Sequence, residues 1–383
     1  MAENSRPLRV LQVLEPSGGG SGRHFIDLCR GLIERGHQVV AVYSPSRAEA
    51  RFVEELQSLR LDGLHAIAMK RAPHPSDLAA LAALRRVIRS AGPFDVIHGH
   101  SSKAGFLVRL RLPGLTHVPR LYTPHAFRTM DPTLGTAGKL IFGGVEAMLG
   151  RLFSDKVICV SPEEQDHAAR TLRIPAPLLT TIVNGVHTPG SGQRDILRVR
   201  LGFRPEDFVF GFVGRLSAQK APERLVGAFA RIGSEFPAAR LLMIGFGELE
   251  PEVRLLADRL DVSARMVLTS EIPGPLAMQA MDAFVMPSRY EAMSYAMLEA
   301  AAAAKPMILT EVGGATTVLD EGVNGRLVAN EDDTSALSAA MLEFHDPQRA
   351  AIYRAGAQRR ASLYSLDTMV DQTIATYRNV MLR

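Results

Sequence analysis

Short apolar segments rich in valine, isoleucine and leucine recur along the chain, and stretches with helical spacing separate them. Runs as continuous as RVLQVL at residues 9–14 are typical of strands that are buried on both faces, as in a parallel sheet. The helical stretches 23–35 and 77–90 end at or just before a glycine, as many helices do. This alternation predicts βαβ units and parallel sheets. The expected strands of the first half are 9–14, 38–44, 95–101, 120–127, 155–161 and 181–186.

The same alternation resumes in the second half of the chain. A length of 383 residues is too great for one continuous core, so two domains are expected. The stretch HTPGSGQR at residues 187–194 is polar and rich in glycine and proline, which is typical of a domain boundary. We therefore predict two doubly wound α/β domains, residues 1–186 and 195–366, with a linker at 187–194 and a final helix at 367–383. The expected strands of the second domain are 207–215, 239–247, 265–270, 283–288 and 305–310.

Composition excludes several classes of protein. The 44 Lys and Arg residues nearly balance the 40 Asp and Glu residues, so charge gives no support for nucleic-acid binding, and no nucleic-acid partner is expected. The two cysteines, Cys29 and Cys159, lie in apolar segments and favour a reducing compartment over a disulfide framework or a cysteine zinc site. The apolar run near the start is too short for a secretion signal, and no run is long enough to span a bilayer. We expect a cytoplasmic protein that at most rests on a membrane.

Two features of the first half could contribute to a binding site. Gly18, Gly19 and Gly20 follow the first expected strand and precede a helix, where backbone amides can approach an anion closely. The dinucleotide pattern G-x-G-x-x-G fails because Arg23 occupies its last position, so a tight turn is an equal alternative. His125 lies at the end of the strand expected at 120–127, where it can face a cleft or serve as a structural hydrogen-bonding residue.

The second half carries a stronger set of charged candidates. Arg215 and Lys220 follow an expected strand and can clamp phosphate at the carboxyl edge of a parallel sheet, although two solvated cations are the alternative. Glu291 lies in a strand–loop transition, and Glu299 lies in an apolar helix that Ser294 could cap. Two carboxylates about 12 Å apart along a helix could hold the ends of an extended ligand such as a nucleotide sugar. A solvated helix face is the alternative for Glu299.

Taken together, these stretches resemble the retaining, nucleotide-sugar-dependent glycosyltransferases of the GT-B fold, of the glycosyltransferase family 4 type. The resemblance spans nearly the whole chain, and its most specific part is the E-x7-E element from Glu291 to Glu299, preceded by the Arg215 and Lys220 element. It implies two Rossmann-like domains that face a central cleft, with the acceptor bound by the first domain and the nucleotide sugar by the second. The final helix would then cross back to the first domain.

The resemblance also implies roles for the donor-site residues. Arg215 and Lys220 would neutralise the diphosphate leaving group, and Glu299 would hold the ribose hydroxyls. Glu291 would hold hydroxyls of the donor sugar, beside backbone amides near Met293 and Ser294.

Further expectations follow from the same resemblance. His125 would contact the transferred sugar, and the loop with Gly19 and Gly20 would approach the donor phosphate and the acceptor. No metal and no cofactor are implied, and the chain contains no D-x-D element. The chain departs from the family pattern at Ala292, Met293 and Ser294, which leaves the donor sugar open, and at Ala221, where glycine is frequent.

The acceptor is expected on the first domain, because residues 1–190 hold 23 Lys and Arg against 16 Asp and Glu. The stretches SSKAGFLVRLRLPG and KLIFGGVEAMLGRLF mix cations with apolar residues, which suits an anionic lipid surface or a polyprenyl-diphosphate-linked saccharide. Helices that pack on the sheet with basic outer faces are the alternative. The candidate acceptor and membrane residues are Lys103, Arg109, Arg111 and Lys139.

The predicted function is retaining transfer of a hexosyl residue from a UDP- or GDP-sugar to a saccharide hydroxyl. The expected acceptor is a polyprenyl-diphosphate-linked glycan of bacterial surface polysaccharide synthesis, at the cytoplasmic face of the inner membrane. Three alternatives remain: a nucleotide-sugar epimerase of the same fold, a phosphorylase of the same fold, and a non-catalytic subunit that binds sugar or lipid.

Overall fold

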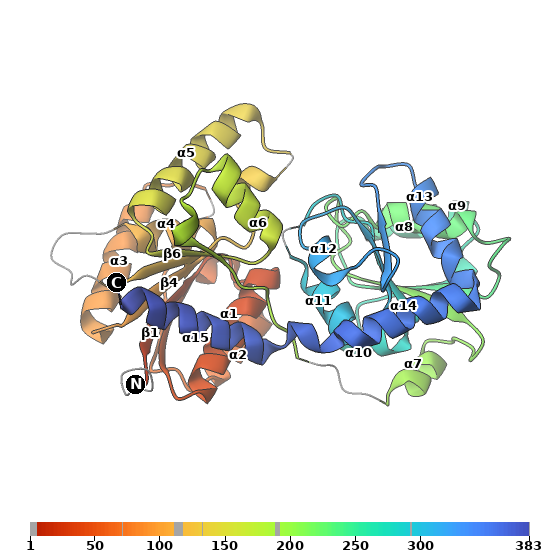
Figure 1. Cartoon of the computed structure of the whole chain (residues 1–383), viewed down its shortest axis with the longest axis horizontal. Coiled ribbons are helices and arrows are strands. Elements are labelled where there is room, and N and C mark those ends of the chain that lie inside the picture. The colour runs from red at the N-terminus through yellow and green to blue at the C-terminus, as the bar shows by residue number, and fades with distance from the viewer. Residues whose placement is uncertain are drawn as a thin grey trace. The chain divides into compact units, whose positions relative to one another are not determined.

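The chain divides into two compact α/β units. The computed structural model describes residues 6–70, 72–110, 118–131, 133–187, 192–291 and 293–382. The first unit contains residues 1–185 together with 366–383, and the second contains residues 186–365 (Figure 1).

The first unit is built on a seven-stranded parallel sheet with the order β3-β2-β1-β4-β5-β6-β7. Chain order reverses between β1 and β4, so the neighbouring strand ends diverge there and create the point at which open α/β sheets bind ligands. The strands are β1 (Arg9–Leu14), β2 (Gln38–Tyr43), β3 (Gly63–Ala66), β4 (Val96–His100), β5 (Arg120–Thr123), β6 (Lys156–Cys159) and β7 (Leu179–Thr181).

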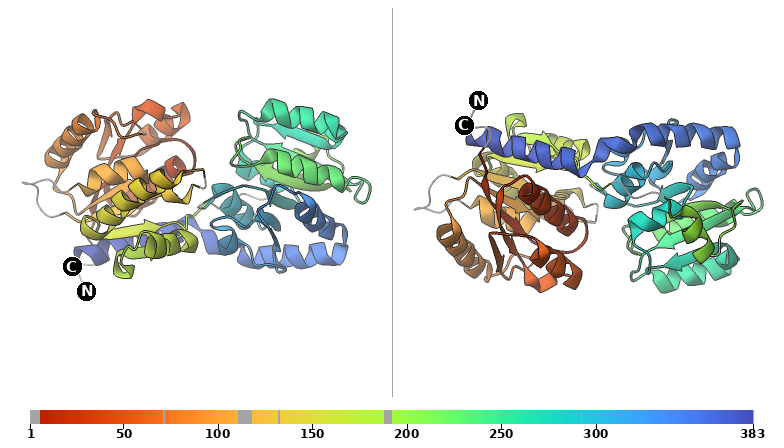
Figure 2. Two further views of the ribbon diagram at one scale, coloured as in Figure 1. Left: turned by 90° about the horizontal axis from the view of Figure 1, so that it is seen from above. Right: turned by 90° about the horizontal axis from the view of Figure 1, so that it is seen from below.

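Alternate residues of these strands are buried against helices on opposite faces of the sheet (Figure 2). Val10 and Leu14 pack toward α1 (Gly19–Glu34) and α15 (Leu366–Met381), whereas Leu11 and Val13 pack toward α3 (Asp77–Ala91) and α4 (Ser101–Arg109). Period-2 alternation with both faces apolar is what a central parallel strand requires. The remaining α-helices of this unit are α2 (Ala50–Ser58), α5 (Thr136–Leu152) and α6 (Pro162–Asp166).

Helix α15 belongs to the first unit although it follows the second unit in the chain. It lies against α1 (Figure 1), where a Cβ at Gly31 would stand 2.4 Å from Val370, so only glycine allows this close approach. At the rim, Arg35 of α1 pairs with Asp367 at 2.9 Å and with Asp371 at 2.6 Å. The buried Tyr377 reaches the core of the sheet.

The second unit repeats the architecture on a six-stranded sheet with the order β10-β9-β8-β11-β12-β13, and its switch point lies between β8 and β11. Its strands are β8 (Phe208–Val213), β9 (Ala239–Ile244), β10 (Met266–Thr269), β11 (Ala283–Met286), β12 (Met307–Thr310) and β13 (Gly325–Val328). Its α-helices are α7 (Arg194–Arg200), α8 (Pro222–Arg231), α9 (Glu250–Arg259), α10 (Gly274–Ala277), α11 (Tyr295–Ala302), α12 (Ala315–Val318), α13 (Ser335–Leu342) and α14 (Pro347–Arg360).

The predicted fold class is confirmed, because both sheets are parallel and doubly wound. Three strands differ from the prediction. The segment 181–186 contributes only Thr181 to β7 and otherwise forms a loop that carries Asn184. The short strands β3 and β13 were not predicted, because four residues of mixed polarity give too little periodicity. Within the described ranges no helix is both long and apolar enough to cross a bilayer.

Candidate active site

The switch point of the second unit brings together three of the predicted donor residues. Lys220 Nζ lies 2.6 Å from Glu291 Oε1, and both side chains are largely buried, at 15% and 8% exposed. The same nitrogen donates to Ser294 Oγ at 3.3 Å. Two further hydrogen bonds join the loops after β8 and β11: Arg289 N donates to Gln219 O, and the Gln219 amide donates to the carbonyl of Tyr290. The loops therefore hold a cation, a carboxylate and a hydroxyl at one sheet edge.

Ser294 occupies the N-cap position of α11, but its side chain caps no backbone amide. The expectation that it caps the helix through its hydroxyl is therefore wrong, because that hydroxyl accepts a hydrogen bond from Lys220 instead. The first-turn amides of α11 are not taken by this side chain, and such amides attract anions. Met293, beside it, is buried.

The other two charged candidates lie near this cluster. Glu299 is half-buried in α11, and its Oε2 would be 3.9 Å from a Cβ placed at Gly274, the first residue of α10. Arg215 is exposed and follows Gly214, at which a Cβ would stand 3.5 Å from the Lys220 side chain. Arg215, Lys220 and Glu291 thus belong to loops at the carboxyl edge of β8 and β11, and Glu299 lies in the second turn of α11, the helix that follows β11.

The backbone conformation at Ala221 shows why glycine is frequent at this position in the family that the sequence resembles. It is buried and adopts the left-handed conformation, with φ 48° and ψ 51°, as the N-cap of α8. The left-handed conformation crowds a Cβ, and only glycine adopts it without cost. The turn ends the loop that positions Lys220.

Sequence reasoning missed the bracing residue Arg224, whose buried guanidinium bonds Asn330 and Asp332 after β13.

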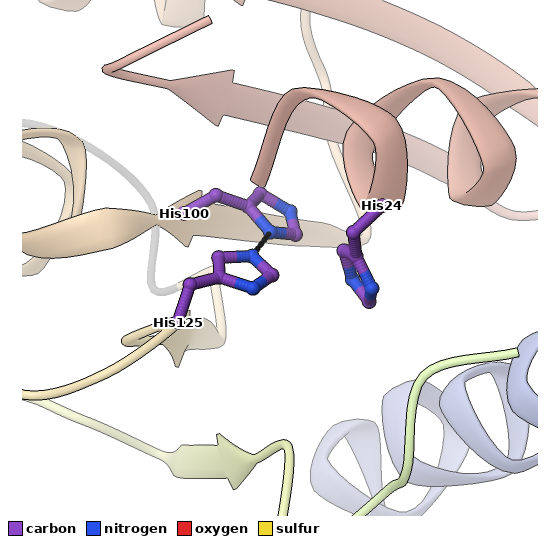
Figure 3. A group of neighbouring side chains, drawn as sticks. All are labelled: His24, His100 and His125. Carbon is purple, nitrogen blue, oxygen red and sulfur yellow. Dashed lines mark hydrogen bonds between the residues drawn. The ribbon is translucent and has the colours of Figure 1, made fainter. Parts of the chain in front are cut away.

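The switch point of the first unit gathers three histidines (Figure 3). His24 comes from α1, His100 ends β4, and His125 follows β5. His100 Nδ1 lies 3.2 Å from His125 Nε2, and the His24 ring centroid lies 4.7 Å from that of His125. The prediction singled out His125 alone. The adjacency of β1, β4 and β5 could have pointed to the other two, because the carboxyl ends of neighbouring parallel strands meet at one edge.

Hydrogen bonds settle which ring nitrogen of His100 and His24 carries a proton. Asn184 Oδ1 can only accept, so His24 donates from Nδ1 over 2.8 Å. Gln12 Oε1 likewise accepts from His100 Nε2 over 2.8 Å, which leaves the lone pair of His100 on Nδ1. His125 Nε2 donates to that lone pair.

A second hydrogen-bond network beside this trio includes Tyr377 of helix α15. The Gln12 amide donates to the Tyr377 oxygen at 2.9 Å, and the Tyr377 hydroxyl donates to His98 Nδ1 at 2.7 Å. His98 then donates from Nε2 to Thr123 Oγ1 at 2.9 Å. Gln12, Tyr377, His98 and Thr123 are all buried, and these hydrogen bonds give each of the four side chains a partner, as buried polar groups require.

The four histidines are uncharged near neutral pH. Burial lowers the pKa of His24 to about 4, against the smaller raising effect of the Asn184 hydrogen bond. Burial and the neighbouring imidazoles also lower the pKa of His98, His100 and His125 well below the ordinary value.

A buried glutamate anchors the turn that presents His125. Both His125 and Ala126 have positive φ, 54° and 83°, which is unusual outside glycine and is maintained only where neighbours hold it. Glu164 accepts hydrogen bonds from Ala126 N and from Val160 N, each at 2.7 Å. Burial raises the pKa of Glu164 to about 7, although these backbone bonds oppose the rise.

The predicted glycine loop is a helix start. Gly18 is the N-cap of α1 in an extended conformation, and Gly19 and Gly20 begin the helix, with Gly19 at φ 70°. No side chain caps these amides, which leaves them able to meet an anion. His24 follows in the next turn of the same helix.

Two of the predicted acceptor cations are buried, so their prediction as surface residues is wrong. Lys103 Nζ lies 2.5 Å from Asp77 Oδ2 and ties α4 to α3. Arg109 is fully buried, pairs with Glu146 at 2.8 Å and stacks 3.8 Å above the Tyr122 ring. Both cations therefore form ion pairs with carboxylates of neighbouring helices. Arg111 lies outside the described residues.

Lys139 is exposed, as predicted, and it begins an apolar surface on α5. Four large apolar side chains of this helix are strongly exposed, from 47% to 73%: Leu140, Ile141, Met148 and Leu152. These positions are one, seven and four residues apart, which at about 100° per residue keeps them within an arc of roughly 120° on one side of the helix. Arg151 adds a second exposed cation at the end of α5.

Comparison with known proteins identifies the family. Residues 18–189 match Glycosyltransferase Family 4, and residues 207–346 match the family described as Glycosyl transferases group 1. The chain belongs to the GT-B glycosyltransferases of the family 4 type. Glycosyl transfer from a nucleotide sugar is the activity of this family, and the predicted assignment to it is confirmed, whereas retention of configuration stays a prediction.

Two curated relatives illustrate the range of this glycosyltransferase family. D-inositol 3-phosphate glycosyltransferase 1 of Catenulispora acidiphila is 27% identical over 96% of this chain and 93% of its own length. The UDP-Gal:alpha-D-GlcNAc-diphosphoundecaprenol alpha-1,3-galactosyltransferase of Escherichia coli is 28% identical over 69% of both chains.

Solved structures share the fold of this glycosyltransferase along nearly its whole length. HepE of Anabaena, in complex with UDP and glucose, has a TM-score of 0.80 at 22% identity and covers 97% of this chain and 100% of its own. Sucrose-phosphate synthase of Thermosynechococcus elongatus has a TM-score of 0.79 at 19% identity and covers 98% and 100%. These likenesses confirm the two-domain GT-B fold.

Proposed function

We propose that this glycosyltransferase moves a hexosyl residue from a UDP- or GDP-sugar to a saccharide hydroxyl with retention of anomeric configuration. The observation that carries the proposal is the cluster of Lys220, Glu291 and Ser294 beside the amino end of α11. A cation and the first-turn amides of a helix suit a diphosphate, and a carboxylate suits sugar hydroxyls. UDP is the first nucleotide to test, because the Escherichia coli relative is named for UDP-Gal and HepE was solved in complex with UDP.

The donor roles follow the placement of the charges. Lys220 and the exposed Arg215 neutralise the diphosphate together with the α11 amides, so the leaving group requires no metal ion. Glu299 holds the ribose hydroxyls, and Glu291 exchanges its contact with Lys220 for hydroxyls of the donor sugar, beside the backbone at Met293.

Retention follows from a front-face transfer. The bond from the acceptor oxygen to the anomeric carbon forms on the face from which the phosphate oxygen departs. The departing diphosphate takes the proton of the acceptor hydroxyl, so no enzymic nucleophile is needed. His125 contacts the transferred sugar, and the helix start at Gly19 and Gly20 approaches the donor phosphate and acceptor. In this scheme the first unit binds the acceptor and the second binds the donor.

The acceptor in this proposal is a polyprenyl-diphosphate-linked glycan at the cytoplasmic face of the bacterial inner membrane. The Escherichia coli relative, which is named for a diphosphoundecaprenol-linked acceptor, supports this choice. The exposed apolar side of α5, flanked by Lys139 and Arg151, supports peripheral contact with anionic lipid.

The donor assignment is tested by product release and by two isosteric variants. Nucleoside diphosphate release from UDP- and GDP-sugars is expected only when a saccharide acceptor is present, and NMR of the product should give the anomeric configuration of the donor. Glu299→Gln should raise KM for the donor about tenfold or more, whereas Glu291→Gln should chiefly lower kcat. The exposed Glu271→Gln serves as the control.

Three outcomes contradict this assignment. Sugar isomerisation without an acceptor indicates an epimerase, and release that depends on inorganic phosphate indicates a phosphorylase. Inverted product configuration removes the front-face pathway.

Membrane contact is tested by sedimentation with vesicles that contain anionic phospholipid. The wild-type chain should sediment with the vesicles, and a Leu140→Asp, Met148→Asp double variant should stay in the supernatant, because each exposed apolar side chain lost removes burial in the lipid interface. Leu255→Asp, on the exposed side of α9, should leave sedimentation unchanged. Equal sedimentation of the double variant would remove α5 as the contact surface.

A further inference from the structure

Hydrogen bonds of the first unit run head to tail from His125 into the core. His125 Nε2 donates to His100 Nδ1, and His100 Nε2 donates to Gln12 Oε1. The Gln12 amide donates to the Tyr377 oxygen, and the Tyr377 hydroxyl donates to His98 Nδ1. Every donor in this series therefore points away from His125, and the dipoles of the bonds are aligned.

The first bond of the series lies along the planes of both rings (Figure 3). The rings of His100 and His125 are nearly parallel, at 22°, and their centroids are 5.5 Å apart. This separation is close to the 3.2 Å between the bonded nitrogens plus one ring radius on each side, so the rings meet edge to edge. Such a contact aligns the N–H of one ring with the lone pair of the other, which couples the tautomers of the two rings.

His125 has one nitrogen left to meet a ligand. Burial and the neighbouring imidazoles lower the pKa of His100 and His125 well below the ordinary value, so each ring carries one proton at neutral pH. The proton of His125 is on Nε2, so Nδ1 holds a lone pair and can only accept. Among the described residues no group donates to this nitrogen, and His125 is only half-buried.

The orientation of the Gln12 amide decides which tautomer the two rings adopt. An amide turned by half a rotation would present its NH₂ group to His100 Nε2, so His100 and then His125 would have to carry their protons on Nδ1. Tyr377 opposes this rotation, because its oxygen accepts from the Gln12 amide while its hydroxyl donates to His98. The rotation would therefore also require a new tautomer of His98, and these inner residues are buried away from water.

We propose that Gln12 and Tyr377 are positioning residues for glycosyl transfer, because they hold His125 with its Nδ1 lone pair toward a hydroxyl of the transferred sugar. This inference rests on the contact between His125 and that sugar in the proposed function. The aligned bonds place the negative end of the series at Nδ1. Glycosyl transfer, like glycoside hydrolysis, develops positive charge on the sugar ring. A lone pair stabilises that charge and an N–H opposes it, so the effect falls on kcat.

NMR of the full chain, labelled with ¹⁵N at histidine and without ligand, tests the tautomer. Protonated and unprotonated nitrogens of a neutral imidazole have well-separated shifts, and the His125 signals are identified by their loss in His125→Asn. In the wild-type chain His125 should carry its proton on Nε2. Tyr377→Phe should populate the form protonated on Nδ1. Thr373→Val, a buried change in the same helix whose hydroxyl donates to the Met369 carbonyl, should keep the wild-type tautomer.

Steady-state kinetics test whether the tautomer matters for transfer. Tyr377→Phe and Gln12→Leu should each lower kcat about three- to tenfold and change KM for the donor less than twofold, because a contact to uncharged groups is weakened only in the transition state. Thr373→Val should keep both constants. Misfolding is recognised in the histidine spectrum, since an unfolded first unit would merge its histidine signals into one set.

Three results overturn the inference: a wild-type His125 protonated on Nδ1, a Tyr377→Phe chain that keeps the wild-type tautomer, and a changed tautomer with unchanged kcat. The donor proposal fails in a different way. It is contradicted when the wild-type chain releases no nucleoside diphosphate in the presence of an acceptor, whereas this inference is contradicted by a chain that transfers sugar while His125 carries its proton on Nδ1.

Discussion

The two units share one architecture, but the switch point of the second unit holds charged side chains and that of the first holds uncharged ones. In the second unit the switch point between β8 and β11 holds Lys220 against Glu291 at 2.6 Å. In the first, the switch point between β1 and β4 holds His24, His100 and their neighbours, whose pKa values burial lowers. The difference teaches that strand order decides where a site forms, whereas the side chains of the loops and helix starts decide its chemistry.

Loss of the Lys220 charge should have the largest effect on the charged site. Lys220→Ala should lower kcat/KM about 30- to 1,000-fold, or roughly 2–4 kcal/mol, because a preorganised cation near the departing diphosphate is removed and Glu291 is left without its partner. Steady-state kinetics with varied donor measures it, and the exposed Lys70→Ala is the control. A loss below about tenfold would place the diphosphate elsewhere.

The first unit should show its own pH dependence through Glu164. The folded-state pKa of about 7 exceeds the ordinary value of 4.5, so the folded chain binds more protons between these values. The stabilising contribution of Glu164 is therefore fully present below about pH 4.5 and lost as the pH rises through about 7, a change of about 3 kcal/mol.

Glu164→Gln should flatten this part of the profile, because the amide does not titrate. Urea denaturation across the pH range measures it, with hydrogen exchange of the 120–130 peptides to follow the turn at Ala126 locally. Asp166→Asn, an exposed carboxylate of the same helix, should keep the wild-type slope. Parallel profiles for wild type and Glu164→Gln would show that this carboxyl does not titrate in that range.

Two buried tyrosines sharpen the comparison between the units. Tyr377→Phe should cost about 1–3 kcal/mol of unfolding free energy, because His98 and Gln12 are fully buried and would lose a partner. Tyr353→Phe should cost less, because its acceptor Glu343 is 25% exposed and water can replace the hydroxyl. Urea denaturation measures both costs. Equal costs would mean that the hydrogen bonds of Tyr377 with Gln12 and His98 add no more to the free energy of unfolding than one ordinary hydrogen bond.

The smallest expected effect concerns backbone conformation in both units. Ala221→Gly and Ala126→Gly should each raise stability by up to about 1 kcal/mol, because both alanines have positive φ and glycine removes the crowding of Cβ. Ala230→Gly in helix α8 should lower stability by about 1 kcal/mol. Thermal unfolding measures all three, and a loss at Ala221 or Ala126 would mean that the alanine methyl group stabilises its turn.

The charged site was the easier of the two to predict. Arg215, Lys220, Glu291 and Glu299 lie within two short stretches, each next to a strand whose pattern is visible in the sequence, so local spacing places them at one sheet edge. The histidine trio depends instead on strand adjacency, because residues 24, 100 and 125 meet only when β1, β4 and β5 align. Reading one strand end at a time therefore found only His125.

The errors on the acceptor surface have the same origin. Lys103 pairs with Asp77, which is 26 residues away in the sequence, and Arg109 pairs with Glu146, which is 37 residues away. A composition argument counts these cations as surface charge, because it cannot see partners that tertiary packing supplies. Leu140 and Met148 were likewise not distinguished from core residues, since an exposed apolar stripe and a buried one have the same periodicity.

The position of α15 has a consequence for how the protein is made. Every residue of the second unit leaves the ribosome before α15 does, yet α15 contributes Val370 and Tyr377 to the core of the first unit. Until about 180 further residues have been translated, one face of the amino-terminal sheet is therefore only partly covered, by α1 and α2, and His98 lacks its hydroxyl partner. The order of synthesis and the order of folding therefore differ in this chain: the unit that is synthesised first is completed last.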